Sequence, residues 1–245
     1  MRTILLGCFI AMLFCSCFDL QVGPPIHKIA TGIWKGVFVV GEEKIPVIFE
    51  VARTDNDSLL LTFKDGNHLT KATKTRKFGD SLFVDFGESQ KQLRVKVDLD
   101  EIKGFLLDKE NKEYPIQFLG QFANHNRFPD VRQTPKADLT GDWRMTISLN
   151  QDAVQVGSLR LTTKGNFAEG KLLLPNAIEV PLEGTIQDNK LILSGFNGSE
   201  VALISATVTN AQVLTKGNLI VNNATYYWTA TASAGVEQPK NISTN

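Results

Sequence analysis

The chain contains one sequence pattern twice, and this repetition limits the folds that it can adopt. The segment Thr31-Gly32-Ile33-Trp34 returns as Thr140-Gly141-Asp142-Trp143, and at the same offset Leu82 corresponds to Leu191. Two further pairs of segments match in the same order, 103–107 with 216–220 and 114–118 with 226–230. These ordered matches indicate a tandem duplication, with repeat units at residues 30–123 and 139–233.

Within each unit, polar and apolar residues alternate with a period of two, which is typical of strands with one face in water. Arg94, Lys96 and Asp98 alternate with Val95 and Val97. Turn-forming Gly, Asn and Asp residues recur about every 8–12 residues, as in sandwiches and barrels. We therefore predict an all-β protein made of two small β-barrels or sandwiches, each with about eight antiparallel strands.

The remaining segments have the composition of connections, and the charge is balanced. Residues 124–138 are polar and contain two prolines, which predicts a linker. We predict a tether at 17–29 and a disordered tail at 234–245. The chain carries 26 basic and 26 acidic residues, and its richest cationic run, Lys71 to Lys77, is short. Nucleic-acid binding needs a concentrated positive surface, so this class of function is excluded.

The N-terminus has the layout of an export signal. Arg2 precedes an apolar run from Ile4 to Phe14, which is shorter than the roughly 20 residues of a membrane span. The stretch Leu13-Phe14-Cys15-Ser16-Cys17 resembles the lipobox of bacterial lipoproteins. The resemblance implies a signal peptide at 1–16, acylation of Cys17 and a lipoprotein of the bacterial cell envelope, at the outer membrane or facing the periplasm. A plain secretory signal, cleaved elsewhere, is the alternative.

The cysteines lie entirely within this segment. Cys8, Cys15 and Cys17 are the three in the chain. Cleavage before Cys17 would remove two of them and acylation would consume the third. The mature chain would then have no disulfide, no redox pair and no thiolate nucleophile or metal ligand.

The Gly-x-Trp pattern at the head of each unit resembles the first strand of lipocalin-like barrels. The resemblance implies that Gly32, Trp34, Gly141 and Trp143 form a structural motif that closes one end of each barrel. Short barrels fill with their own side chains, so we favour packed cores over ligand cavities. Two sets of residues follow from this reading: the predicted core aromatics Phe38, Phe49, Phe83, Phe105 and Phe118, and the candidate ligand or partner contacts Trp34, Trp143, Tyr227 and Trp228.

A wider resemblance covers most of the chain after the signal. The segments 33–51, 79–84, 126–128, 139–143, 182–199 and 227–230 resemble the β-rich N-terminal region of TlpA-like, membrane-anchored thiol-disulfide oxidoreductases. In that family this region precedes a thioredoxin-fold domain that holds a Cys-x-x-Cys pair. This sequence has no such pair, and no catalytic residue of the family has a counterpart here. The resemblance therefore implies a relative of the non-catalytic region, without the family's activity.

No motif for catalysis or metal binding stands out, and we expect neither enzyme activity nor a cofactor. The three histidines, His27, His68 and His125, are isolated in the sequence, which argues against a zinc site. No Gly-x-Ser-x-Gly elbow is present, and no acidic cluster completes a calcium-binding loop. A carboxylate pair for glycoside hydrolysis stays open, because nothing singles one out among Glu50, Asp85 and Glu183.

The function that we expect from these features is that of a lipid-anchored, extracytoplasmic accessory or interaction module. Its exposed sheet edges, or the groove between its units, would dock a protein partner, and a separately encoded thioredoxin-fold protein is one candidate. The alternative is a lipocalin-like binder of a small apolar or glycan ligand. Membrane contact through the N-terminal lipid is expected in both cases, and binding of nucleic acid in neither.

Overall fold

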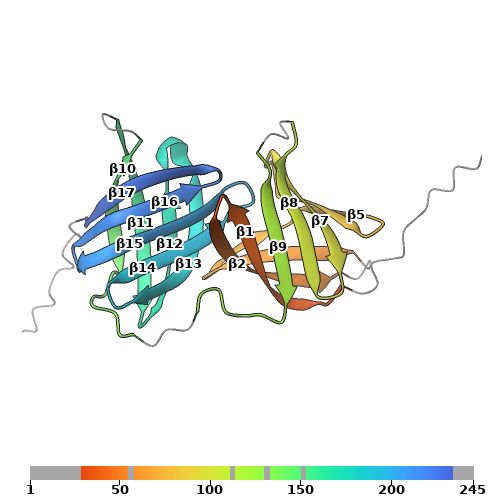
Figure 1. The fold of residues 1–245 in the computed structure, drawn as a ribbon, viewed down its shortest axis with the longest axis horizontal. Helices are drawn as coiled ribbons and strands as arrows, with labels where there is room; N and C mark the ends of the chain where they lie inside the picture. The colour runs from red at the N-terminus through yellow and green to blue at the C-terminus, as the bar shows by residue number, and fades with distance from the viewer. Residues whose placement is uncertain (1–28, 55–57, 111–113, 130–132, 150–152, 234–245) are drawn as a thin grey trace, which may run out of the picture.

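The computed structural model describes residues 29–54, 58–110, 114–129, 133–149 and 153–233. The predicted signal peptide at 1–16, the lipidation site Cys17, nearly all of the tether and the predicted tail at 234–245 lie outside the described residues. Two strand-built units lie side by side (Figure 1), and the chain between them runs along one side of the molecule.

The first unit is an antiparallel sheet of nine strands that is strongly curved but open. The strands are β1 (Gly32–Val40), β2 (Glu43–Arg53), β3 (Leu59–Asp65), β4 (His68–Lys71), β5 (Lys74–Phe78), β6 (Ser81–Asp85), β7 (Lys91–Asp98), β8 (Glu101–Asp108) and β9 (Ile116–Phe122). Their order in the sheet is β4-β3-β2-β1-β9-β8-β7-β6-β5. The short strands β4 and β5 are the two edges.

The second unit is a closed up-and-down barrel of eight strands. The strands are β10 (Gly141–Ser148), β11 (Val154–Lys164), β12 (Phe167–Leu173), β13 (Glu179–Gln187), β14 (Lys190–Phe196), β15 (Val201–Asn210), β16 (Val213–Val221) and β17 (Ala224–Ala232). Pairing of β10 with β17 closes the barrel. The predicted fold class, an all-β protein of two barrel-like units, is confirmed, with one strand more than expected in the first unit. Within the described ranges, no helix is long and apolar enough to cross a membrane.

The repeated Gly-x-Trp motif has the same geometry at the head of both units. Trp34 Nε1 donates a hydrogen bond of 3.0 Å to the carbonyl of Ala30, and Trp143 Nε1 donates one of 2.9 Å to the carbonyl of Leu139. Both indole rings are buried. Each buried ring therefore holds the segment before the first strand against its own unit.

The core of the first unit is built from aromatic rings that touch one another. Phe38 lies 4.7 Å from Phe118, and Phe49 lies 5.3 Å from Phe63, measured between ring centroids. All four rings are fully buried. Because ring faces and edges fill the space between the strands, the side chains themselves occupy the interior.

Two of the predicted core aromatics are not in the core. Phe83 is half-buried and Phe105 is 44% exposed. Their neighbours explain the error, because side chains alternate between the two faces of a strand. Leu82 and Val84, on either side of Phe83, and Leu106, next to Phe105, are buried in the core. Phe83 and Phe105 therefore lie on the outer face of the sheet.

The second unit completes the core of the first. Phe196, at the end of β14, is fully buried among rings of the first unit, 4.8 Å from Phe63, 5.1 Å from Phe38 and 5.2 Å from Phe86. Val201 and Ile220 belong to the same hydrophobic cluster. The open end of the first unit is thus sealed by residues of the barrel.

A buried ion-pair network also joins the two units. Arg127, in the predicted linker, lies 2.9 Å from Asp65 of β3 and 3.4 Å from Glu183 of β13. It also donates a hydrogen bond of 2.9 Å to the carbonyl of Ser194 and another to the carbonyl of Lys64. Part of the linker is therefore a buried structural element that fixes one unit against the other.

Candidate functional site

The outer face of strands β5 to β8 gathers basic and aromatic side chains. In the strand register, Arg76 of β5 pairs with Phe83 of β6, which pairs with Arg94 of β7, which pairs with Phe105 of β8. We call this line of four residues the cross-strand row. Paired residues of neighbouring strands project on the same side, so the row lies across the sheet on the face opposite the core.

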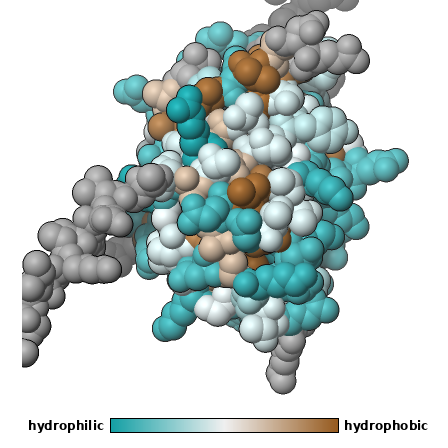
Figure 2. Space-filling model, turned by 90° about the vertical axis from the view of Figure 1, so that its left-hand side faces the viewer, coloured by the Kyte–Doolittle hydropathy of each residue, from teal (hydrophilic) through white to brown (hydrophobic). Residues whose placement is uncertain are grey.

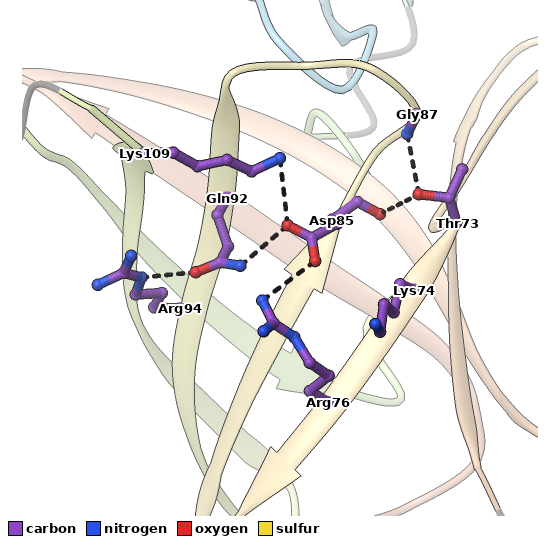
Figure 3. Close-up of a pocket in the computed structure, with 8 residues that line it drawn as sticks. All are labelled: Thr73, Lys74, Arg76, Asp85, Gly87, Gln92, Arg94 and Lys109. Atoms are coloured by element: carbon purple, nitrogen blue, oxygen red, sulfur yellow. Dashed lines mark hydrogen bonds and ion pairs between the residues drawn. The ribbon is translucent and has the colours of Figure 1, made fainter.

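Next to this row lies a recess of about 540 Å³, which we call the basic recess. Its lining includes the cations Lys74, Arg76, Arg94 and Lys109 and the single carboxylate Asp85 (Figure 3). The cations come from β5, from β7 and from the residue after β8. Strand pairing thus brings together charges that lie far apart in the sequence.

Asp85 is the centre of the hydrogen bonds in the recess (Figure 3). Its Oδ1 accepts a bond of 2.9 Å from Gln92 Nε2 and lies 3.3 Å from Lys109 Nζ. Its Oδ2 lies 3.3 Å from Arg76 Nη2. Burial acts to raise the pKa of Asp85, but the hydrogen bonds from Gln92 and Lys109 and the charges of Lys109 and Arg76 outweigh it. The pKa of Asp85 therefore lies below its ordinary value, and the carboxylate is ionised at neutral pH.

Thr73 holds the rim of the recess in place. Its hydroxyl donates a hydrogen bond of 3.1 Å to the carbonyl of Asp85 and accepts one of 3.0 Å from the amide of Gly87. Gly87 has a φ of 53°, in the left-handed region that favours glycine at a turn. These bonds fix the β6–β7 turn beside the start of β5, so the backbone of the recess is formed before any ligand arrives.

The recess has more positive charge than its own carboxylate can balance. Arg94 uses Nε for a 2.7 Å hydrogen bond to Gln92 and lies over the ring of Phe83, 5.7 Å from its centroid. Lys74 forms no ion pair with any of the described residues. Four cations around one carboxylate leave an excess of positive charge on an accessible face. The arrangement is therefore suited to binding an anionic group through charge-assisted hydrogen bonds.

The sequence-predicted contact residues lie elsewhere. Trp34, Trp143 and Trp228 are buried, whereas Tyr227 on β17 is 74% exposed. None of the four lines the basic recess. Of this set, Tyr227 is the side chain presented to solvent.

The three candidate carboxylates of a glycosidase belong to three separate networks. Glu50 pairs with Lys64 at 2.8 Å, Asp85 lies in the basic recess, and Glu183 belongs to the Arg127 network. The structure therefore gives each of them a cationic partner of its own.

The cations of the recess were missed by reasoning from the sequence. The run from Lys71 to Lys77 contains Lys74 and Arg76, but it is too short to stand out by itself. The available signal was the pair of turn sequences Gly79-Asp80 and Gly87-Glu88, which places Arg94 two strands away from Arg76. Antiparallel pairing of these strands puts the two arginines on one face of the sheet.

The opposite end of the molecule, formed by the second unit, presents a different surface. Figure 2 shows that the apolar side chains on this face are scattered as separate spots among hydrophilic ones. This face therefore offers no continuous apolar patch, and the basic recess remains the more distinctive feature.

Comparison with known proteins adds little to this description. No protein-family model and no curated protein matches the chain. Among solved structures, the chain is similar to a Bacteroides fragilis protein assigned provisionally to the outer membrane, with 8% sequence identity and a TM-score of 0.25. That match covers 83% of this chain and 97% of the other. The fold assignment rests on the strand pairing of this chain itself.

Proposed function

We propose that this chain is a lipid-anchored accessory module of the bacterial cell envelope that works by binding. Its binding site is the basic recess, which takes an anionic group of the ligand or partner. The observation that carries the proposal is the convergence of Lys74, Arg76, Arg94 and Lys109 around one carboxylate on an accessible face.

Two features of the sequence support the proposed attachment to the membrane and the proposed accessory role. The lipobox-like segment that ends at Cys17 supports anchoring by lipid, since several acyl chains hold a soluble domain durably at a membrane. The resemblance to the region that precedes the catalytic domain in TlpA-like proteins supports an accessory role.

The interior of the first unit offers the lipocalin-like alternative no support. In the first unit, the rings of Phe38, Phe49, Phe63 and Phe118 contact one another across the space where a ligand would lie. A surface site needs no such space, which is why the geometry supports the basic recess better than an internal cavity.

Calorimetric titration of the purified protein with sulfate and with acetate tests the binding site. We expect saturable binding that weakens as sodium chloride is added, because screening reduces attraction between exposed charges. The double variant Arg76→Ala/Arg94→Ala should bind sulfate at least about tenfold more weakly, since each charge-assisted hydrogen bond contributes about 1.5–3 kcal/mol.

The matched control removes the same charge from the second unit. Lys164→Ala/Lys190→Ala alters two exposed lysines that do not line the recess, and its affinity for sulfate should equal that of the parent. Equal losses in the two double variants would show that only net charge matters and would reject the site.

Anchoring is tested separately by membrane fractionation and mass spectrometry. The natural protein should carry a diacylglycerol-modified Cys17 at its N-terminus, and Cys17→Ala should move the protein out of the membrane fraction. An unprocessed N-terminus on the natural protein would refute the anchor but not the recess.

A further inference from the structure

We infer that the ligand of the basic recess is an extended acidic glycan that lies across strands β5 to β8. This inference rests on the proposed function and names the class of its ligand. It follows from the cross-strand row, Arg76, Phe83, Arg94 and Phe105, which continues from the recess along the outer face of the sheet.

The spacing of the row is set by the sheet. Neighbouring strands lie about 4.8 Å apart, so a row across four strands is roughly 14 Å long. The two arginines occupy alternate strands and are therefore about 10 Å apart at their backbones. A polymer with acidic groups at regular intervals meets such a row at more than one point, whereas a single small anion meets only one.

The aromatic residues of the row offer apolar contacts, which a small inorganic anion does not use. Phe105 is 44% exposed and pairs directly with Arg94 across the sheet. A pyranose ring has an apolar C–H face, and burial of that face on an exposed aromatic ring is favourable. The sugar ring and its acidic substituent are thus matched by two adjacent side chains.

The guanidinium of Arg94 is held in an orientation that suits this contact. Its guanidinium lies over Phe83, and its Nε is bonded to Gln92, which fixes the plane of the group. Its terminal nitrogens form no hydrogen bond or ion pair within the described part of the chain. A planar guanidinium held in this way presents two parallel N–H donors to a carboxylate or a sulfate.

The neighbouring charges favour a narrow ligand over a membrane surface. Beyond the row, Lys96 lies 3.6 Å from Asp80, and Lys103 is paired with Glu101. The lysines next to the row on this face are therefore paired with carboxylates, while the strip formed by the row and the recess keeps its positive excess. A flat layer of anionic headgroups would call for a broad face of unpaired cations, but a single polymer chain needs only this strip.

The test measures binding of the intact protein to defined polymers. Polygalacturonate and dextran sulfate are the acidic probes, neutral dextran is the uncharged control, and inorganic sulfate is the small anion. Anionic phospholipid vesicles form a separate arm. We expect both acidic polymers to bind at least tenfold more tightly than sulfate, and neutral dextran and vesicles not to bind.

Two variants separate the row from the recess. Phe105→Ala should weaken binding of both polymers at least fivefold and leave the affinity for sulfate unchanged, because the small anion does not reach that ring. Arg76→Ala/Arg94→Ala should weaken binding of every anion, and Lys164→Ala/Lys190→Ala should change none. Circular dichroism of each variant confirms that the sheet is retained.

Each contrary result has a definite meaning. If sulfate binds and the polymers bind no more tightly, or if Phe105→Ala has no effect on the polymers, the glycan is rejected and the anion site stands. Binding of vesicles in place of polymers rejects the glycan in favour of a membrane surface. If no anion binds at all, both the glycan and the proposed function fail.

Discussion

The guanidinium of Arg127 lies 2.9 Å from the carboxylate of Asp65, and both side chains are almost completely buried. The arginine belongs to the segment between the units and the aspartate to the first unit, while Glu183, the second carboxylate near Arg127, belongs to the barrel. Three parts of the chain that are distant in sequence thus meet in one ionic network. This network therefore holds the two repeats against each other.

Replacement of Arg127 by Met should destabilise the protein strongly. Loss of one partner of a buried ion pair leaves an uncompensated charge and costs about 3–5 kcal/mol. Urea denaturation measures the loss. As a control, Lys136→Ala breaks the exposed pair with Asp188 and should cost at most about 1 kcal/mol. Similar costs for the two variants would contradict the structural role of Arg127.

Replacement of Phe196 by Ala should weaken the first unit, although Phe196 belongs to the second. Truncation of a buried Phe costs about 3–5 kcal/mol, and here the cavity opens beside Phe38 and Phe63. Hydrogen exchange should therefore accelerate in β1 and β3, the strands that carry Phe38 and Phe63. Phe167→Ala, at an exposed position of the barrel, should leave exchange in these strands unchanged.

The stability of the protein should depend on Asp65 in the weakly acidic range. Burial, which acts against the charge of Arg127, raises the pKa of Asp65 from 3.8 to about 6. A raised pKa means that the folded protein holds the proton more tightly, so the free energy of unfolding should rise as pH falls from about 6 to 3.8. The effect is at most about 3 kcal/mol.

Denaturation at a series of pH values checks this dependence, and Asp65→Asn should flatten it. Asp85 has the opposite effect. Because its pKa is lowered in the folded protein, the free energy of unfolding falls as pH falls below the ordinary range of a carboxyl group. The pH range in which Asp65 affects stability therefore does not overlap the range in which Asp85 does. A stability that falls from pH 6 to pH 4 in the parent protein, and falls equally in Asp65→Asn, would refute the assignment to Asp65.

Removal of the negative charge in the basic recess should strengthen anion binding. Asp85→Asn leaves Arg76 and Lys109 without their carboxylate partner, so these cations become available to a ligand. We expect sulfate to bind about threefold to tenfold more tightly in calorimetric titration, a gain of about 1 kcal/mol that is typical of one partly exposed charge pair. Weaker binding would show that Asp85 holds the cations in their binding positions.

Much of the architecture could be predicted from the sequence because the pattern is repeated. The alternation around Val95 and Val97 predicts strands, and the second Gly-x-Trp predicts a second unit of the same kind. The ninth strand could not be found in this way. β4 and β5 are edge strands of four and five residues with little buried surface, so they lack the alternation that marks a strand.

The errors and omissions arise from contacts across the chain. Phe83 and Phe105 lie in apolar surroundings in the sequence, but only the strand register shows which face each ring occupies. Arg127 lies in a segment with the polar composition of an exposed linker, and no local signal distinguishes it from its neighbours. Its burial depends on carboxylates from two different units, which a local pattern cannot reveal.

The way in which Phe196 seals the first unit also has a consequence for the order of events during synthesis. The ribosome releases the N-terminal repeat before Phe196, Val201 and Ile220 exist, and translation adds only about 5–20 residues each second. For some seconds the nascent repeat therefore carries an unfinished apolar end, which a chaperone could cover. A gene split between the repeats should give a C-terminal fragment that folds by itself and an N-terminal fragment that aggregates.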